Sequence, residues 1–280
     1  MRRRFFVENF SDAAAVLRGE AADHLGRVLR AQPGQFYELS DGHRVWLGKI
    51  ERVALAKRGK SRIEFALIET VPTSEPSLRI DLLISLVKFD RFEWCLEKAT
   101  ELGANEIVPL AAARTDKPLV AAAAKRHERW QKILRESAQQ SRRLGPPVLH
   151  EIGTPEQAFR KYSAGLRIVL SERSDAPPLR AVLAGTSESW LQPDSSSGHD
   201  FGRAASRADS ERLQPLREGV SAALAIGPEG GWTAQEIEAA RASGFAEASL
   251  GKNILRTETA VLASLSILAF ALEPGDAPAE

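Results

Sequence analysis

The chain has 280 residues, of which 43% are hydrophobic and 27% charged, and its formal net charge at pH 7 is +1. This composition is that of an ordinary globular protein and excludes disordered and fibrous classes, and the length favours two domains. The single cysteine, Cys95, excludes an intramolecular disulfide and a thiolate zinc cluster, which fits a reducing cytoplasm. No segment resembles a secretory signal, and the longest apolar run, residues 260–272, is too short to span a bilayer, so we expect a cytoplasmic protein with no membrane association.

The first seventy or so residues have the pattern of a small β-rich domain. Residues 35–40 and 43–53 flank Asp41 and Gly42, and an Asp-Gly pair favours a two-residue hairpin turn. Alternating apolar residues at 63, 65 and 67 predict a further half-buried strand. Residues 70–77 contain two prolines and no apolar periodicity, so we predict one domain over residues 1–72 and a second over residues 78–275.

The second domain alternates short apolar runs with segments of helical periodicity, which predicts an α/β fold with a mostly parallel sheet. The expected strands are residues 80–86, 106–110, 167–170, 222–226 and 246–250. Helices are expected near residues 92–102 and over residues 121–143. Residues 185–219 are rich in Ser, Asp, Arg and Gly and predict a mobile insertion.

Two glycine-containing loops follow predicted strands near the carboxyl end. The first is GPEGG at residues 227–231, and the spacing of Thr233 and Glu236 predicts a capping box with a helix starting at Ala234. The second is LGKNILRTETA at residues 250–260, which leads into the last helix. Open α/β sheets bind ligands at the carboxyl ends of their strands, and glycine-rich backbone can approach the polar edge of an adenine. Simple turn chemistry remains an alternative for the first loop.

Better-known phosphate and hydrolase motifs are absent. The spacing of these loops fits neither a P-loop nor a dinucleotide-binding fingerprint, and the chain has no Gly-x-Ser-x-Gly elbow and no His-Glu-x-x-His pair. No metal ligands are therefore predicted. Basic residues cluster instead, with seven Lys or Arg against two Glu between residues 125 and 143, and local fields of this kind attract phosphates. A solvated helix face is the alternative explanation for that cluster.

At these residues the sequence resembles the SPOUT class of methyltransferases, and specifically the bacterial 16S ribosomal RNA uridine N3-methyltransferase family. The two glycine loops are similar to that family's cofactor-loop motifs. KFDRFEWCLEKATELGANEIVPL at residues 88–110 and RWQKILRESAQQSRR at 129–143 are similar to its other conserved blocks, and RRFFVEN and HLGRVLR to its RNA-binding domain. Asn253 departs from the pattern, because the family usually has an arginine there.

The resemblance implies a fold, a cofactor and partners. It implies a carboxyl-terminal SPOUT domain with a trefoil knot at about residues 222–265, and a PUA-like β-barrel over residues 1–72. It also implies S-adenosylmethionine as methyl donor, a homodimer, and 16S ribosomal RNA in the small ribosomal subunit as substrate.

The resemblance and the loop positions together give candidate site residues. The catalytic candidates are Arg256, to stabilise charge on the uracil oxygens, and Glu258 and Glu229, to accept the N3 proton; a purely structural role at the helix start is open for Glu258. The cofactor-binding candidates are Ile226, Gly227, Gly230, Gly231, Leu250, Gly251, Ile254, Leu255 and Thr259. The RNA-binding candidates are Arg3, Arg4, His24, Arg27, Arg30, Gln140, Arg142 and Arg143.

Two other functions compete with this hypothesis. A non-catalytic RNA-binding factor for ribosome assembly could share the fold, and Asn253 is the feature that favours it. An enzyme that binds a different adenine-containing cofactor is the second alternative, and the failed phosphate-loop motifs count against it.

Overall fold

The computed structural model describes residues 3–11, 13–57, 59–73, 78–162, 165–190 and 220–272. Its contacts divide the chain into two compact units. Unit 1 comprises Met1–Pro76, Leu96–Glu101 and Lys125–Leu149, and unit 2 comprises Ser77–Cys95, Leu102–Ala124 and His150–Glu280. The helix over residues 127–140 belongs to the same unit as the amino-terminal strands, although it lies after the domain boundary that the sequence predicts at residues 72–78.

Unit 1 contains a mainly antiparallel sheet of order β1-β4-β5-β6-β3-β2, in which β1 alone pairs in parallel, with β4. The strands are β1 (Arg4–Phe6), β2 (Phe10–Ser11), β3 (Ala14–Arg18), β4 (Phe36–Ser40), β5 (Val45–Ala54) and β6 (Arg62–Val71). Two short helical segments, α1 (Gly19–Asp23) and a π-helix (His24–Val28), follow β3, while α4 (His127–Gln140) and β9 (Val148–Leu149) come from the later segment.

The predicted hairpin is present, but its turn is longer than expected. The β4 and β5 strands are joined by residues 41–44 rather than by two residues. Asp41 explains the difference, because its Oδ1 accepts hydrogen bonds from the backbone amides of His43 at 3.0 Å and Arg44 at 2.8 Å. The predicted alternation on β6 is confirmed at Ile63 and Phe65, which are fully buried in the core of this unit.

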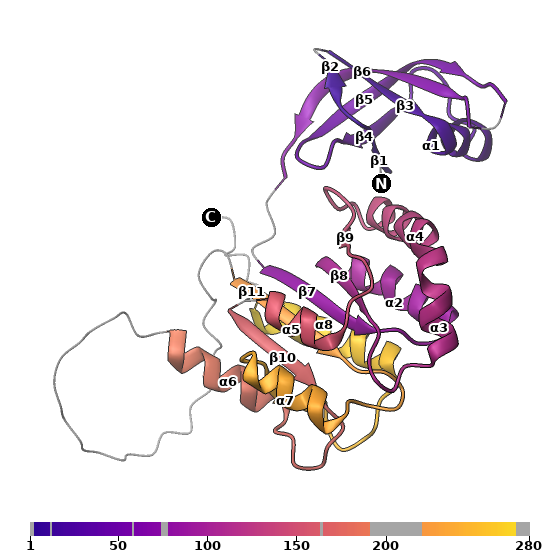
Figure 1. Ribbon diagram of the computed structural model, residues 1–280. Coiled ribbons are helices and arrows are strands. Elements are labelled where there is room, and N and C mark those ends of the chain that lie inside the picture. Colours follow the sequence, from indigo (N-terminus) through magenta and orange to yellow (C-terminus); the bar gives the residue numbers. More distant parts are fainter. Residues whose placement is uncertain are drawn as a thin grey trace. The chain divides into compact units, whose positions relative to one another are not determined.

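Unit 2 is an α/β structure built on parallel strands in the order β12-β10-β11-β7-β8 (Figure 1). The strands are β7 (Leu78–Ser85), β8 (Ala104–Leu110), β10 (Leu166–Leu170), β11 (Val220–Ile226) and β12 (Ala246–Ala248). The helices are α2 (Phe89–Glu101), which continues into unit 1, α3 (Lys117–Ala123), α5 (Pro155–Lys161), α6 (Leu179–Trp190), α7 (Ala234–Ala242) and α8 (Thr257–Leu272). The predicted α/β fold with a mostly parallel sheet is confirmed for this part of the chain.

Helices cover both faces of this sheet. On one face, Leu83, Val108 and Val169 pack with Phe159 of α5 and Ile237 of α7 in one buried cluster. Neighbouring residues of a strand point to opposite faces, so the buried residues that alternate with this set support the other face, where α8 contacts β7 and β11. Burial on both sides explains why the strand sequences read as continuous apolar runs.

Two predicted segments differ from the structure. The expected helix over residues 121–143 is interrupted by a 3₁₀ turn at Ala124–Arg126, which separates α3 from α4. The predicted start of the insertion at residue 185 is wrong, because α6 continues to Trp190. The rest of the predicted insertion, residues 191–219, lies outside the described part of the chain.

Two carboxylates lie side by side on β7 and β8. Asp81 pairs in register with Glu106, whose Oε2 contacts His150 Nε2 at 2.6 Å and accepts a hydrogen bond from Tyr162 at 3.1 Å. Burial, and then the Glu106 carboxylate, raise the pKa of Asp81 to about 6 against the opposing effects of Arg79 and His150. The folded protein therefore binds the proton of Asp81 more tightly than the unfolded chain does.

We expect Asp81→Asn to stabilise the protein at alkaline pH. A raised carboxyl pKa contributes stability that is complete below the unfolded value of 3.8 and is lost as pH rises through about 6. The asparagine cannot ionise, so at pH 8 the variant should unfold with a free energy about 1 kcal/mol higher than wild type, after discounting for partial exposure. Urea unfolding of both proteins at pH 4 and pH 8 measures this, and a difference that does not grow with pH would contradict it.

Candidate functional site

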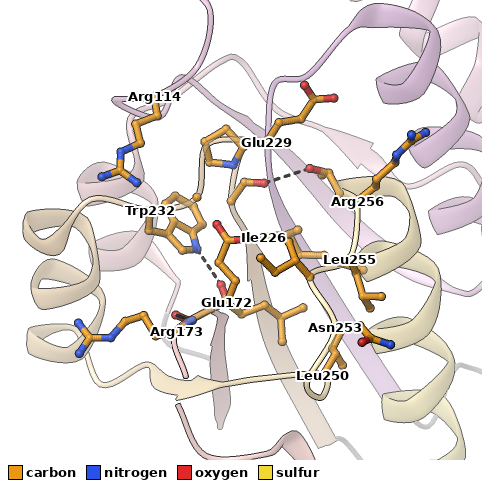
Figure 2. Close-up of a pocket in the computed structure, with 18 of the residues that line it drawn as sticks. Arg114, Glu172, Arg173, Ile226, Glu229, Trp232, Leu250, Asn253, Leu255 and Arg256 are labelled. Carbon is orange, nitrogen blue, oxygen red and sulfur yellow. Dashed lines mark hydrogen bonds between the residues drawn. The ribbon is translucent and has the colours of Figure 1, made fainter. Parts of the chain in front are cut away.

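The carboxyl ends of the parallel strands surround a cavity of about 590 Å³ (Figure 2). Its walls come from the loops after β10, β11 and β12, with Arg91 from the start of α2 and Arg114 from the loop after β8. Parallel strands place all of these loops at one edge of the sheet. The two glycine-containing loops, which are separate in sequence, therefore meet at one site, as predicted.

The GPEGG loop is held from two sides. The Trp232 indole packs over Gly227, where an added Cβ would lie 3.1 Å from the ring, and its Nε1 donates to the Leu170 carbonyl at 2.9 Å. Arg114 donates to the Gly230 carbonyl at 2.8 Å. Gly231 has a φ of +69°, a conformation that favours glycine. These contacts fix the loop before any ligand is bound.

The predicted capping box at the start of α7 is confirmed. Thr233 Oγ1 accepts from the Glu236 amide at 3.2 Å, and Glu236 Oε2 accepts from the Thr233 amide at 2.8 Å. Glu236 is 3% exposed, and its Oε1 also accepts from the Ala113 amide at 2.8 Å. One buried carboxylate thus joins the loop after β8 to the helix that follows the GPEGG loop.

The second glycine loop lies opposite the first. Thr257, at the start of α8, donates through Oγ1 to the Gly227 carbonyl at 3.4 Å, which links the two loops (Figure 2). Gly251 has a φ of +131°, and Asn253 lines the cavity. Apolar side chains from the two loops and from β11, including Ile226 and Leu255, form one wall beside exposed backbone. Such a wall suits a flat ring with a polar edge.

Arg91 connects the two carboxylates that were predicted as proton acceptors. It forms ion pairs with Glu229 and, at 3.8 Å, with Glu258. Glu229 lines the cavity, whereas Glu258 lies in the first turn of α8 outside the lining. The Oε2 atom of Glu258 is buried and accepts no hydrogen bond. Cys95 of α2 is fully buried, and burial, followed by the Glu258 charge, raises its pKa to about 12, so this thiol is part of the core.

Most of the predicted cofactor residues lie on the cavity. Those that line it are Ile226, Gly227, Gly231, Leu250, Gly251, Ile254 and Leu255. Two others do not: Gly230 turns its carbonyl to Arg114, and Thr259 lies on the exposed side of α8. Arg256, the first catalytic candidate, lines the cavity and is exposed (Figure 2).

Three predicted RNA-binding arginines instead make contacts inside unit 1. Arg4 is 7% exposed and forms an ion pair with Glu38 at 2.9 Å, and Arg142 also pairs with Glu38. Arg143 donates to the Thr100 carbonyl at 2.9 Å, and burial lowers its pKa. Their guanidinium groups are already partnered, which makes structural roles the better interpretation. Sequence spacing could not show these partners, because Glu38 is remote in the chain from Arg142.

The other predicted RNA-binding residues are exposed. They are Arg3, His24, Arg27, Arg30 and Gln140. Arg27 forms an exposed ion pair with Asp23 at 2.9 Å, and a pair of this kind is weak enough to exchange for a phosphate.

Sequence reasoning missed the wall of the cavity formed by residues 170–173. Ser171, Glu172 and Arg173 follow β10 directly and line the site. The signal was present, because the strand at 167–170 was predicted and the same rule about carboxyl ends of strands applies to it. The loop contains no glycine, and the sequence argument selected only loops that contain glycine, so residues 171–173 were not predicted as part of the site.

Gly231→Ala should destabilise the protein by about 1–2 kcal/mol, the cost of a left-handed conformation for an L-residue. The added Cβ would also lie 2.3 Å from Glu172 Oε1 and displace that carboxylate. Gly185→Ala in α6 is a matched control, because nothing lies within 4 Å of its added Cβ, and it should stabilise the helix by about 0.5–1 kcal/mol. Urea unfolding compares the two, and wild-type stability of Gly231→Ala would contradict the strain argument.

Comparison with known proteins matches the chain to the RNA methyltransferase domain family over residues 74–192 and 199–269. Two relatives carry the name ribosomal RNA small subunit methyltransferase E. The protein from Synechocystis is 33% identical, covering 95% of this chain and 76% of its own, and that from Bacillus subtilis is 30% identical, covering 97% of both.

Solved structures of methyltransferases are also similar to this chain over nearly its whole length. The ribosomal RNA small subunit methyltransferase E of Neisseria gonorrhoeae, bound to S-adenosyl methionine, has a TM-score of 0.75 and 27% identity, covering 97% of this chain and 98% of its own. A putative methyltransferase from Legionella pneumophila, also with that cofactor bound, has a TM-score of 0.73 and 25% identity, covering 97% and 98%. With its parallel sheet, its cavity at the strand ends and the match over most of its length, this chain belongs to the RNA methyltransferase domain family.

Proposed function

We propose that this protein transfers a methyl group from S-adenosylmethionine to N3 of a uridine in 16S ribosomal RNA of the small subunit. The observation that carries the proposal is the convergence of the two glycine loops on one cavity with Arg256 on its lining, in a chain of the RNA methyltransferase domain family. The names of the relatives support ribosomal RNA of the small subunit as substrate. The resemblance of the loop motifs supports the uridine N3 position.

The cavity fits the proposed cofactor. Ile226, Leu250 and Leu255 supply apolar surface for the adenine ring, and the glycine loops bring backbone amides and carbonyls to its edge. The volume of about 590 Å³ is in the range of small-molecule sites. Two structural neighbours were solved with this cofactor bound. When bound, the cofactor supplies a methyl group activated by its sulfonium.

The residues of the chain would orient the uridine and take its proton. Glu229 or Glu258 accepts the proton from N3, and Arg91 holds both carboxylates in place. As N3 loses its proton, negative charge grows on the uracil oxygens, and Arg256 stabilises it. The N3–methyl bond then forms as the sulfur–methyl bond breaks. Near-attack alignment of the two groups is worth about 7 kcal/mol or more in favourable intramolecular reactions.

The remaining features of the family are part of the same proposal. The exposed candidates Arg3, His24, Arg27, Arg30 and Gln140 would contact RNA phosphates, which makes binding dependent on salt. The strands of residues 1–72 would form a PUA-like barrel, residues 78–275 the SPOUT domain, and residues 222–265 the trefoil knot. A cytoplasmic location accords with the ribosomal substrate. No helix in the described ranges is long and apolar enough to cross a membrane.

The proposal predicts that the protein, given labelled S-adenosylmethionine and small subunits from a strain that lacks the enzyme, labels one uridine at N3. Arg256→Ala should lower the rate by about 100-fold or more, as loss of an oxyanion donor does, and leave the unfolding curve unchanged because the side chain is exposed. Arg180→Ala, an exposed arginine on α6 outside the cavity, is the control.

Each alternative gives a different result in this assay or in a titration of the wild-type protein with S-adenosylmethionine, NAD and ATP. Cofactor binding with no labelled RNA would favour the assembly-factor function that Asn253 suggests. Binding of NAD or ATP in place of S-adenosylmethionine would favour another cofactor. Near-normal turnover of Arg256→Ala would remove Arg256 from the mechanism.

The proposed homodimer has a candidate surface on α8. Leu262, Ile267 and Phe270 lie on one side of this helix with 38%, 39% and 87% of their surface exposed. An apolar helix face of this kind favours burial against a second copy. Phe270→Glu should convert a dimer to a monomer in analytical ultracentrifugation, whereas Val28→Glu, at another exposed apolar residue, should not. A monomeric wild type, or a dimer unaffected by Phe270→Glu, would refute this interface.

A further inference from the structure

The charged side chains of the cavity fall into two groups. The first group is already neutralised within the protein. Arg91 pairs with Glu229, and Arg173 pairs with Asp175 at 2.7 Å and with Glu247 at 3.7 Å. These charges have partners before a ligand arrives, so their net attraction for a charged ligand is reduced.

The second group has no ion-pair partner among the residues that the structure describes. It consists of Glu172 on the loop after β10, Lys252 and Arg256 on the loop after β12, and Arg114 on the loop after β8, whose guanidinium donates to the Gly230 carbonyl. The free negative charge thus stands on one loop, and the free positive charges stand on two others. A ligand with separated charges of both signs would match this arrangement.

Glu172 is placed to act inside the cavity. Its carboxylate points into the space between Trp232 and Ile226 (Figure 2). Its Oε1 lies so close to Gly231 that a Cβ there would be 2.3 Å away. Glu172 is exposed when no ligand is bound. A ligand that covers it beside Trp232 and Ile226 would lower the local dielectric constant and strengthen the attraction.

We propose that Glu172 is the counter-charge for the positive part of the methyl donor and makes the cavity selective for a cationic ligand. This inference rests on the proposed function. S-adenosylmethionine carries a sulfonium and an ammonium, and its product S-adenosylhomocysteine keeps only the ammonium. If Glu172 faces the sulfonium, the attraction ends when the methyl group leaves, and product release is favoured over retention. Lys252 and Arg256 remain available for anionic groups.

Three ligands separate the chemical possibilities. S-adenosylmethionine has both positive groups, S-adenosylhomocysteine has the ammonium alone, and methylthioadenosine has neither but keeps the ribose hydroxyls. Calorimetric titration of each ligand against wild type and Glu172→Gln measures binding without turnover. Glutamine has nearly the same size as glutamate, so the contact with Gly231 is kept while the charge is removed.

The variant should bind S-adenosylmethionine about tenfold more weakly, the size expected when one partly covered charge pair is lost, and methylthioadenosine with unchanged affinity. Unchanged affinity for S-adenosylhomocysteine assigns Glu172 to the sulfonium, and an equal loss for it assigns Glu172 to the ammonium. Glu238→Gln, which makes the same change on the exposed face of α7 outside the cavity, should alter none of the three.

Two results would overturn the inference and leave the proposed function standing. One is equal weakening of all three ligands, which would mean that Glu172 contacts neutral hydroxyls or supports the loop. The other is no change for any ligand. Failure of the wild-type protein to bind S-adenosylmethionine would refute the proposed function itself.

Discussion

The parallel direction of β12, β10, β11, β7 and β8 is the constraint on which the site depends. Each strand delivers its following loop to the same edge of the sheet. The site is therefore assembled from loops remote in sequence, and among the described strand residues only the apolar Leu170 and Ile226 line the cavity. Two contacts then join the loops. Glu236 ties the start of α7 to Ala113, and Thr257 reaches the carbonyl of Gly227. The edge is held in shape by hydrogen bonds within the protein.

The way in which these loops assemble explains why the last residue of GPEGG, Gly231, is a glycine. Its positive φ would tolerate few other residues, and the Glu172 carboxylate occupies the space that a side chain would need. The glycine loop and the loop after β10 are thus complementary surfaces. A substitution at Gly231 would therefore act on the backbone and on the position of the Glu172 carboxylate at once.

Much of this architecture could be predicted because it depends on local pattern. The apolar runs gave the strands of unit 2, and Thr233 with Glu236 gave the start of α7. What escaped prediction depends on tertiary partners. The side-chain hydrogen bonds of Asp41 lengthen the hairpin turn, and the ion pair with Glu38 buries Arg4. The sequence pattern around a charged residue does not reveal whether its partner is a phosphate of a ligand or a carboxylate of its own chain.

Arg91 bears on the choice between the two proposed proton acceptors. A general base must come within hydrogen-bonding distance of the substrate proton. The side chain of Glu229 lines the cavity and is 46% exposed, whereas that of Glu258 is 19% exposed and lies outside the lining. Both carboxylates contact Arg91, so Glu258 can help to position the guanidinium while Glu229 lies on the cavity lining. The geometry therefore favours Glu229 as the acceptor and gives Glu258 a positioning role through Arg91.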